Sequence, residues 1–236
     1  MGRRDRYRSE LRTLDADEWP AYLQERSGLP GPRGNIELAQ AVADEGDPAR
    51  FERFIATDDE YLVFCGVLGL GRSLAEAGDA DVQARLQARL AGHAADPRWR
   101  VREAVAMALQ TLGDADLPRL VDLVVRWSGD RDALVQRAAA AGICEPRLLT
   151  SPEGAACALE VCSRATDALA ARPIDERRDP GVRSLRQALG YCWSVAVAAD
   201  PVAGLPRFMA LTAGQDPDVA WIVRENRRKA RLAKLL

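Results

Sequence analysis

The chain has 236 residues, of which 47% are hydrophobic and 29% charged, and its formal net charge is −2. That apolar content can bury a sizeable core, which excludes a disordered chain, and the near-neutral charge gives no general affinity for nucleic acid. Aromatic residues make up only 6% and alternating β-branched runs are scarce, so an all-helical protein is predicted.

Helices are predicted wherever apolar residues recur at three- and four-residue spacing behind a capping residue. An Asp or Ser followed by Pro is a typical helix start, and it recurs at residues 47/48, 96/97, 151/152, 179/180, 200/201 and 216/217. The predicted helices span residues 5–14, 18–26, 36–45, 48–56, 60–76, 80–94, 97–112, 117–128, 131–144, 152–171, 181–198, 202–213 and 217–234.

The segment Ser27–Asn35, SGLPGPRGN, separates the second and third predicted helices. Its glycines and prolines predict an ordered turn that leads to Asn35 as a helix cap. Glycine-rich loops can also hold phosphate, but no Lys-Ser or Lys-Thr pair follows and no strand precedes, so a connector is favoured.

The helix over 97–112 carries the clearest pattern. Asp96 is expected to cap it, Pro97 to occupy its first position and Gly113 to end it. Its buried stripe is predicted to comprise Val101, Ala104, Val105, Ala108, Leu109 and Leu112. One such helix cannot bury its stripe alone, so the pattern should recur.

An acid, a Val five residues later and a small residue three further do recur. The four sets are Asp58/Val63/Gly66, Asp96/Val101/Ala104, Asp130/Val135/Ala138 and Asp218/Val223/Asn226, and Leu185 with Ala188 fits loosely. Positions 63, 101, 135, 185 and 223 are 38, 34, 50 and 38 residues apart, a period typical of helix-pair solenoids.

The Asp-x4-Val-Arg pattern at Asp96–Arg102 and Asp218–Arg224 resembles HEAT repeats. The resemblance implies an all-α fold: a right-handed α-α superhelix, or HEAT/armadillo-like solenoid, that forms a single elongated domain with a concave face of second helices. Residues 1–34 are expected to form an N-terminal helical cap with the LPGPRG connector, and residues 35–236 the HEAT-like repeat solenoid.

Charge is uneven along the chain. Residues 34–96 carry 12 acidic and 5 basic side chains, a balance of −7, whereas residues 215–236 carry 3 acidic and 6 basic ones. The segment Arg172–Gly181 is a charged loop, for which a solvated connector is the default and a binding role the alternative. Asn226 stands where other repeats have Ala or Gly, so its amide is expected to bond a neighbouring backbone carbonyl.

Cofactor and metal chemistry find no support in the sequence. The five cysteines lack ligand spacing and are expected to be buried thiols, and a single histidine, His93, excludes a multi-histidine metal site. No apolar run is long enough to span a membrane, so a cytoplasmic protein with no cofactor and no metal is expected.

The segment 123–139, LVVRWSGDRDALVQRAA, resembles a repeat of the HEAT-like alkylpurine DNA glycosylases of the AlkD type, through Trp127, Gln136 and Arg137. The segment 187–201 is similar to that family's Ala-Ile-Gly-Trp stretch, with Tyr191 in the place of an active-site Trp. The resemblance implies DNA alkylation repair, with Arg137 as a phosphate contact and Tyr191 as an aromatic wall.

The family's catalytic Asp has no clear counterpart. Aligned without a gap it falls on Arg102, which reverses the charge. A one-residue shift places Trp99 and Glu103 in a Trp-x3-Asp arrangement, with Glu for Asp, one helical turn apart. Glu103 is therefore the candidate catalytic residue only if the protein is a glycosylase.

We predict a non-catalytic HEAT-repeat scaffold whose concave face binds a protein or duplex DNA; the alternative is an AlkD-like glycosylase or an inactive DNA-binding relative. The candidate residues also have structural explanations: the arginines would bond neighbouring Asp residues, and the tryptophans would pack between helices. The candidate binding residues are Arg98, Trp99, Arg102, Trp127, Arg137, Arg186, Tyr191 and Arg224. The sequence does not indicate an oligomeric state.

Overall fold

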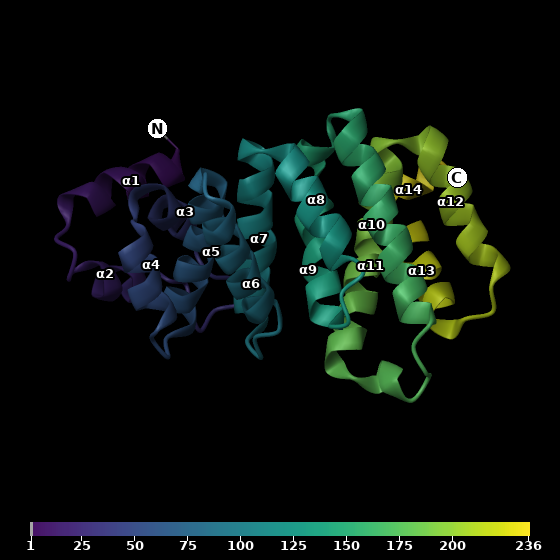
Figure 1. Ribbon diagram of the computed structural model, residues 1–236, viewed down its shortest axis with the longest axis horizontal. Helices are drawn as coiled ribbons and strands as arrows, with labels where there is room; N and C mark the ends of the chain where they lie inside the picture. The colour runs from purple at the N-terminus through teal and green to yellow at the C-terminus, as the bar shows by residue number, and fades with distance from the viewer. Residues whose placement is uncertain (1) are drawn as a thin grey trace. The chain divides into compact units, whose positions relative to one another are not determined.

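The computed structural model describes residues 2–236, and the protein is all-α: 77% of it is helical, and the described residues contain no strand. Its contacts divide the chain into two compact units, unit 1 (Met1–Leu112) and unit 2 (Gly113–Leu236). The division falls inside helix α7 (Trp99–Ala115). Figure 1 labels the helices of both units.

Unit 1 is built around α5 (Glu60–Glu76), which packs against α2, α3, α4 and α6. Every residue from Tyr61 to Gly71 is buried, because neighbours cover this helix on all sides. Gly71 lets α7 approach closely, since a Cβ there would lie 2.5 Å from Ala108 Cα. The other helices of unit 1 are α1 (Arg3–Thr13), α2 (Trp19–Glu25), α3 (Ile36–Glu45), α4 (Pro48–Ile55) and α6 (Ala80–Ala94).

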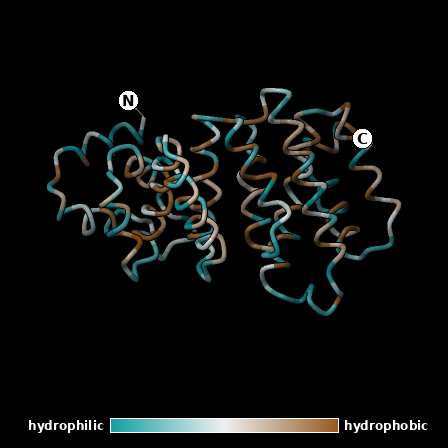
Figure 2. The backbone as a smooth tube through the Cα atoms, in the orientation of Figure 1, coloured by the Kyte–Doolittle hydropathy of each residue, from teal (hydrophilic) through white to brown (hydrophobic). Residues whose placement is uncertain are grey.

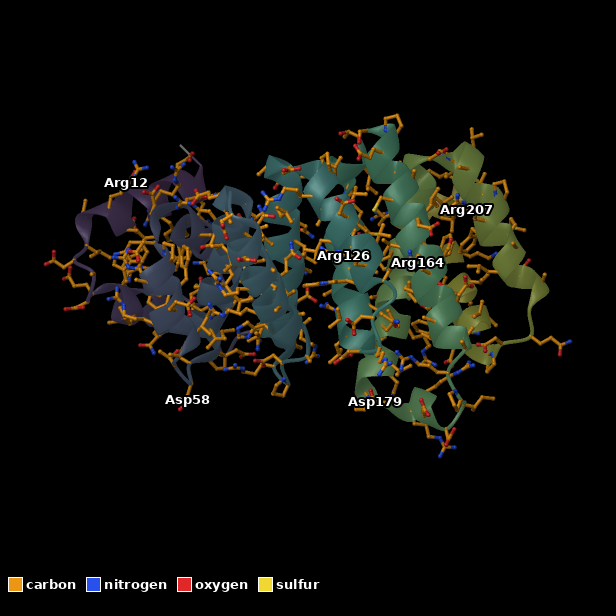
Figure 3. All side chains as sticks on the ribbon, in the orientation of Figure 1. Arg12, Asp58, Arg126, Arg164, Asp179 and Arg207 are labelled. Carbon is orange, nitrogen blue, oxygen red and sulfur yellow. The ribbon has the colours of Figure 1, made fainter. Side chains whose placement is uncertain are left out.

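Helix α1 docks on α3 mainly through ion pairs, because Leu11 is its only residue in the buried core. Arg4 pairs with Asp44 at 2.6 Å, and Arg8 and Arg12 both pair with Glu45 at 2.7 Å. Arg12 is labelled in Figure 3. The predicted N-terminal segment 1–34 is thus tied to α3 electrostatically, and its separation from residues 35–236 stays a prediction.

Unit 2 is a two-layer stack of helix pairs, and α8, α10 and α12 lie side by side in one layer (Figure 1). In the second layer α11 packs between α9 and α13, and α8 pairs with α9 as α10 does with α11. This arrangement is that of repeat solenoids, in which each pair buries its stripe against the next. The helices are α8 (Leu117–Trp127), α9 (Ala133–Ile143), α10 (Pro152–Ala170), α11 (Pro180–Ala199), α12 (Pro201–Ala210), α13 (Pro217–Arg227) and α14 (Ala230–Ala233).

The repeated apolar positions are buried as predicted. Val63 and Val101 are 0% exposed, Val135 5% and Val223 7%, and the small residues three positions later are buried too. In unit 2 these positions fall on the adjacent second-layer helices α9, α11 and α13. The all-α class and the helix-pair construction are therefore confirmed.

Most predicted caps are confirmed, and two at α7 are wrong. Asp47, Ser151, Asp179, Asp200 and Asp216 each accept an N–H of the helix that follows. Asp96 instead accepts the N–H and the guanidinium of Arg98, so α7 begins at Trp99 rather than at Pro97. Gly113 does not end α7, which continues to Ala115. This glycine is needed for packing instead, because its missing side chain leaves room for Leu120 and Leu148.

The predicted single helix over 217–234 is also wrong, because it breaks after α13 and resumes as α14. Leu232 lies nine residues after Val223, about 180° away on a helix of 100° per residue. A continuous helix would therefore point Leu232 away from the core, whereas the break leaves it fully buried with α14 packed on α11.

The five cysteines are all free and buried, as predicted. Cys144 and Cys162 have their sulfur atoms 3.7 Å apart. Burial raises the pKa of Cys157 to about 12 and the pKa of Cys65 further, so both thiols stay protonated at neutral pH.

Candidate binding surface of unit 2

Asn226 locks the last repeat in place. Its side chain is 0% exposed and donates to the carbonyls of Leu189 and Ile222, both at 2.8 Å. Its Oδ1 accepts the N–H of Ser194 at 2.8 Å. The amide therefore bonds a carbonyl of the neighbouring helix as predicted, and it fixes α13 against α11.

The turn after Asn226 brings two cations to Tyr191. Arg231 Nη2 donates to the Tyr191 hydroxyl at 2.8 Å, and its guanidinium lies 4.9 Å from the ring centroid. Lys229 Nζ lies 5.8 Å from the same centroid. Tyr191 is 43% exposed, and Lys229 and Arg231 are half-buried, so a partner can reach the ring and part of each cation.

Neither Lys229 nor Arg231 pairs with an acid among residues 2–236, whereas Arg228 pairs with Glu225 at 2.8 Å. Beside Arg231 lies a hollow of about 400 Å³, lined otherwise by apolar side chains that include Leu149 and Val195. One of these two cations, Arg231, thus lines an apolar hollow. We name Tyr191, Lys229, Arg231 and this hollow the Tyr191 surface.

Arg186 plays the structural part expected of the repeat's arginine position. It pairs with Asp218 of the next repeat at 2.5 Å, and its guanidinium lies 4.7 Å from the Trp221 ring. Trp221 in turn packs beside Gly190. The side chains of Arg186 and Trp221 therefore both join α11 to α13.

The charged loop 172–181 is anchored by Arg177, whose side chain is 8% exposed. Arg177 pairs with Asp216 at 2.5 Å and with Asp218 at 3.3 Å, and donates to the carbonyls of Ala170 and Arg172. Figure 2 shows this loop, between α10 and α11, as a hydrophilic stretch. Asp179, labelled in Figure 3, ends the loop and caps α11.

The candidate residues in unit 1 lie at the start of α7. Arg98 forms a bidentate pair with Asp96, and Arg102 donates to the carbonyls of Asp96 and Pro97. Partial burial raises the pKa of Asp96, but hydrogen bonds from Arg98 outweigh it, so the net shift is downward. Trp99 is 49% exposed, and the Arg100 guanidinium lies 4.7 Å from its ring.

The remaining candidates do not form a catalytic set within one unit. Glu103 is half-buried in unit 1, whereas the half-buried Arg137 and the exposed Tyr191 belong to unit 2. Trp127 is 8% exposed and packs in the core of unit 2, as the structural explanation predicts. Arg224 is exposed on α13, 3.9 Å from Glu225.

Sequence analysis missed Lys229 and Arg231 as members of a site. Both were counted within one long basic helix, whose outward face is ordinarily solvated. The signal that could have revealed them is the phase of Leu232, which does not fit the stripe of Val219, Ile222 and Val223. That mismatch predicts a break, and a break redirects the cations beside it.

The described residues 2–236 also bear on membrane insertion and metal binding. No helix there is long and apolar enough to cross a membrane. No group of three or more His, Cys, Asp or Glu side chains in the same range is placed to hold a metal ion.

No protein-family model matches the chain, and no curated protein matches its sequence. Among solved structures, two crystal structures of engineered proteins are similar to it. The first is 15% identical to this chain, and the match covers 100% of this chain and 98% of the engineered protein with a TM-score of 0.38. The second is 16% identical, and the match covers 96% of this chain and 97% of the engineered protein with a TM-score of 0.38. A designed armadillo repeat protein in complex with the peptide (KR)4 has 12% identity, 95% and 98% coverage, and a TM-score of 0.37. TM-scores below 0.5 do not establish a common fold, so the fold is assigned from the helix contacts of this protein.

Proposed function

We propose that the protein is a non-catalytic helical-repeat scaffold that binds an acidic segment of a partner protein on the Tyr191 surface. The supporting observation is the pair of cations on the exposed Tyr191 ring, neither paired with an acid among the described residues, beside an apolar hollow. Carboxylates would pair with Lys229 and Arg231, and a neighbouring apolar side chain would fill the hollow.

An acidic peptide fits this surface better than duplex DNA does. The whole chain has a net charge of −2 and a pI of about 5.6, whereas a duplex contacts many phosphates and needs a broad basic face. Two of the candidate binding arginines are paired with acids, Arg98 with Asp96 and Arg186 with Asp218.

The experiment is a peptide-display selection on the full chain, followed by anisotropy with the enriched peptides. We expect Asp or Glu next to Leu or Phe, and affinity about tenfold lower for Lys229→Gln/Arg231→Gln. Arg183→Gln is the matched control, since Arg183 is exposed on α11 outside this surface. Enrichment of basic peptides, or equal binding by the double variant, would refute the proposal.

A labelled 20-base-pair duplex serves as the competing probe. Duplex binding that weakens steeply with salt and is lost in Lys229→Gln/Arg231→Gln would replace the acidic peptide with DNA as the partner. The same duplex carrying methylated purines tests the glycosylase alternative, which requires base release that Glu103→Gln abolishes. The Arg100 guanidinium lies over the Trp99 ring, where a cationic base would have to stack in a glycosylase. This contact favours the non-catalytic scaffold.

A further inference from the structure

A second basic cavity lies in unit 1, where the loop 27–35 meets the start of α3. Its volume is about 700 Å³, and its lining includes Arg3, Arg26, Arg33, Asn35, Ile36 and Glu37. We call it the loop pocket. None of its residues belongs to the Tyr191 surface.

Hydrogen bonds to backbone carbonyls hold the two ends of the loop together and tie the loop to α7. Asn35 N–H donates to the Ser27 carbonyl at 2.8 Å, and Arg100 donates to the Gly31 carbonyl at 3.0 Å. Gly28 has φ +75°, and a Cβ there would lie 2.9 Å from the Arg33 carbonyl oxygen, so only glycine fits. This closure brings Arg26, before the loop, next to Arg33 near its end.

Asn35 directs the start of α3 at the pocket. Its Nδ2 donates to Tyr7 OH at 2.9 Å and to the Arg26 carbonyl at 3.0 Å, while Oδ1 accepts Leu38 N–H at 3.2 Å. The amides of Ile36 and Glu37 make no hydrogen bond to the described residues. Two free N–H groups and the positive end of the helix dipole therefore favour an anion.

Three arginines from separate segments add charge to this pocket. Arg26 pairs with Glu25 and lies over the Tyr22 ring at 4.2 Å, and Arg3 is 4.0 Å from Glu37. Arg33 is exposed and forms no ion pair with residues 2–236. Glu37 is the opposing acid among the lining residues, and with Glu25 on Arg26 the three arginines face two acids, which leaves a surplus of one positive charge.

We propose that the loop pocket binds the phosphate group of a small phosphorylated molecule. The surplus positive charge attracts a phosphate anion, and its oxygens can accept from the Ile36 and Glu37 amides and from Arg33 together. The volume exceeds what inorganic phosphate needs, so it leaves space for the organic part of an ester. Among the described residues no lysine or hydroxyl side chain lines the pocket, so arginines and backbone amides would hold the anion.

The test is isothermal titration of the full chain with inorganic phosphate, adenosine monophosphate and adenosine. We expect both phosphate-bearing probes to bind, adenosine not to bind, and added salt to weaken binding. Tighter binding of the monophosphate supports an ester as the ligand, and equal affinity supports the free oxyanion. Binding of adenosine as tightly as its monophosphate would overturn the proposal, as would the absence of phosphate binding.

Two variants should act in opposite directions. Arg33→Gln should weaken phosphate binding about tenfold, because a charge-assisted hydrogen bond is lost, whereas Glu37→Gln should strengthen it. Arg53→Gln, exposed on α4 and outside the pocket, is the matched control. Both substitutions lie on exposed or half-buried side chains, and helical circular dichroism checks their folding. Unchanged affinity in Arg33→Gln and Glu37→Gln would refute the site.

Discussion

At the scale of single residues, Asn226 shows how a buried polar group specifies a repeat interface. Apolar repeats place Ala or Gly at this position, and the asparagine costs desolvation unless every donor and acceptor is used. All three of its bonds are made, two of them across to α11. A complete set of bonds fixes the register of the two helices more strictly than an alanine would.

Asn226→Ala should destabilise unit 2 by about 2–4 kcal/mol, because it removes three buried hydrogen bonds, two of which join α13 to α11. Asn226→Asp should also destabilise it, since a carboxylate accepts from Ser194 but cannot donate to Leu189. Urea unfolding measures both effects. Arg227→Ala, at the adjacent exposed residue, is the control and should change the free energy of unfolding by less than about 0.5 kcal/mol. A stability of Asn226→Asp equal to that of the native protein would contradict this account.

At the scale of elements, two segments are tied down by charge rather than by apolar burial. One is α1, held to Asp44 and Glu45 at the end of α3. The other is the loop 172–181, held through Arg177 to the start of α13. Ion pairs of this kind weaken with salt or with loss of one charge, so both attachments respond to solution conditions.

Docking of α1 should weaken in acid. The hydrogen bond from Arg12 chiefly lowers the pKa of Glu45, against the opposing effect of burial. Because the folded pKa lies below the unfolded one, near 4.3, ionised Glu45 stabilises docking above that value, and the stabilisation is lost as pH falls through the folded pKa. Backbone amide shifts of α1, followed by NMR from pH 6 downward, should report this release.

Glu45→Gln should release α1 in the same way at neutral pH, at a cost of about 1 kcal/mol. Glu153→Gln, exposed on α10, serves as its control: it should leave α1 docked at neutral pH and release it in acid as the native protein does. Amide shifts of α1 that stay native in Glu45→Gln would show that α1 docks without the charge of Glu45.

Arg177→Met should destabilise unit 2 by about 2 kcal/mol, below the 3–5 kcal/mol of a fully buried pair because Asp216 and Asp218 are partly exposed. It removes two ion pairs and two bonds to carbonyls. Arg178→Met, the exposed neighbour in the same turn, is the matched control. Equal melting temperatures for the two variants would contradict an anchoring role for Arg177.

At the scale of the whole molecule, charge divides between the units. Unit 1 carries 19 acidic and 15 basic residues, a balance of −4, and unit 2 carries 16 and 18, a balance of +2, which sum to −2. An acidic partner is therefore attracted to unit 2 and repelled by most of unit 1. The loop pocket is a local exception, in which three arginines gather within the acidic unit.

Stability should likewise be local to each unit, since repeat packing sums contributions from neighbouring helices. Phe51→Ala removes a ring that is 1% exposed in unit 1 and should raise hydrogen exchange in α4 and α5. Asn226→Ala should raise exchange in α11 and α13 instead. Hydrogen exchange read by mass spectrometry distinguishes the two patterns, and identical patterns would show that the units unfold as one.

The sequence determined the helical class, most helix boundaries and the buried ladder of Val63, Val101, Val135 and Val223. Caps and helical periodicity depend on residues within a few turns of each other, and the repeat recurs as the same local pattern every 34–50 residues. Asn226 was also identified correctly, because a polar residue on an apolar stripe must find a partner.

Only the tertiary structure decided where helices end under packing constraints and which cations remain unpaired. Gly113 looked like a stop but accommodates Leu120 and Leu148, and the last helix breaks because Leu232 is buried against α11. The position of Lys229 and Arg231 beside Tyr191 depends on a turn that redirects side chains, and the pairing of Arg186 depends on Asp218, which is distant in sequence. Such contacts are set by the packing of whole helices, and no local pattern encodes them.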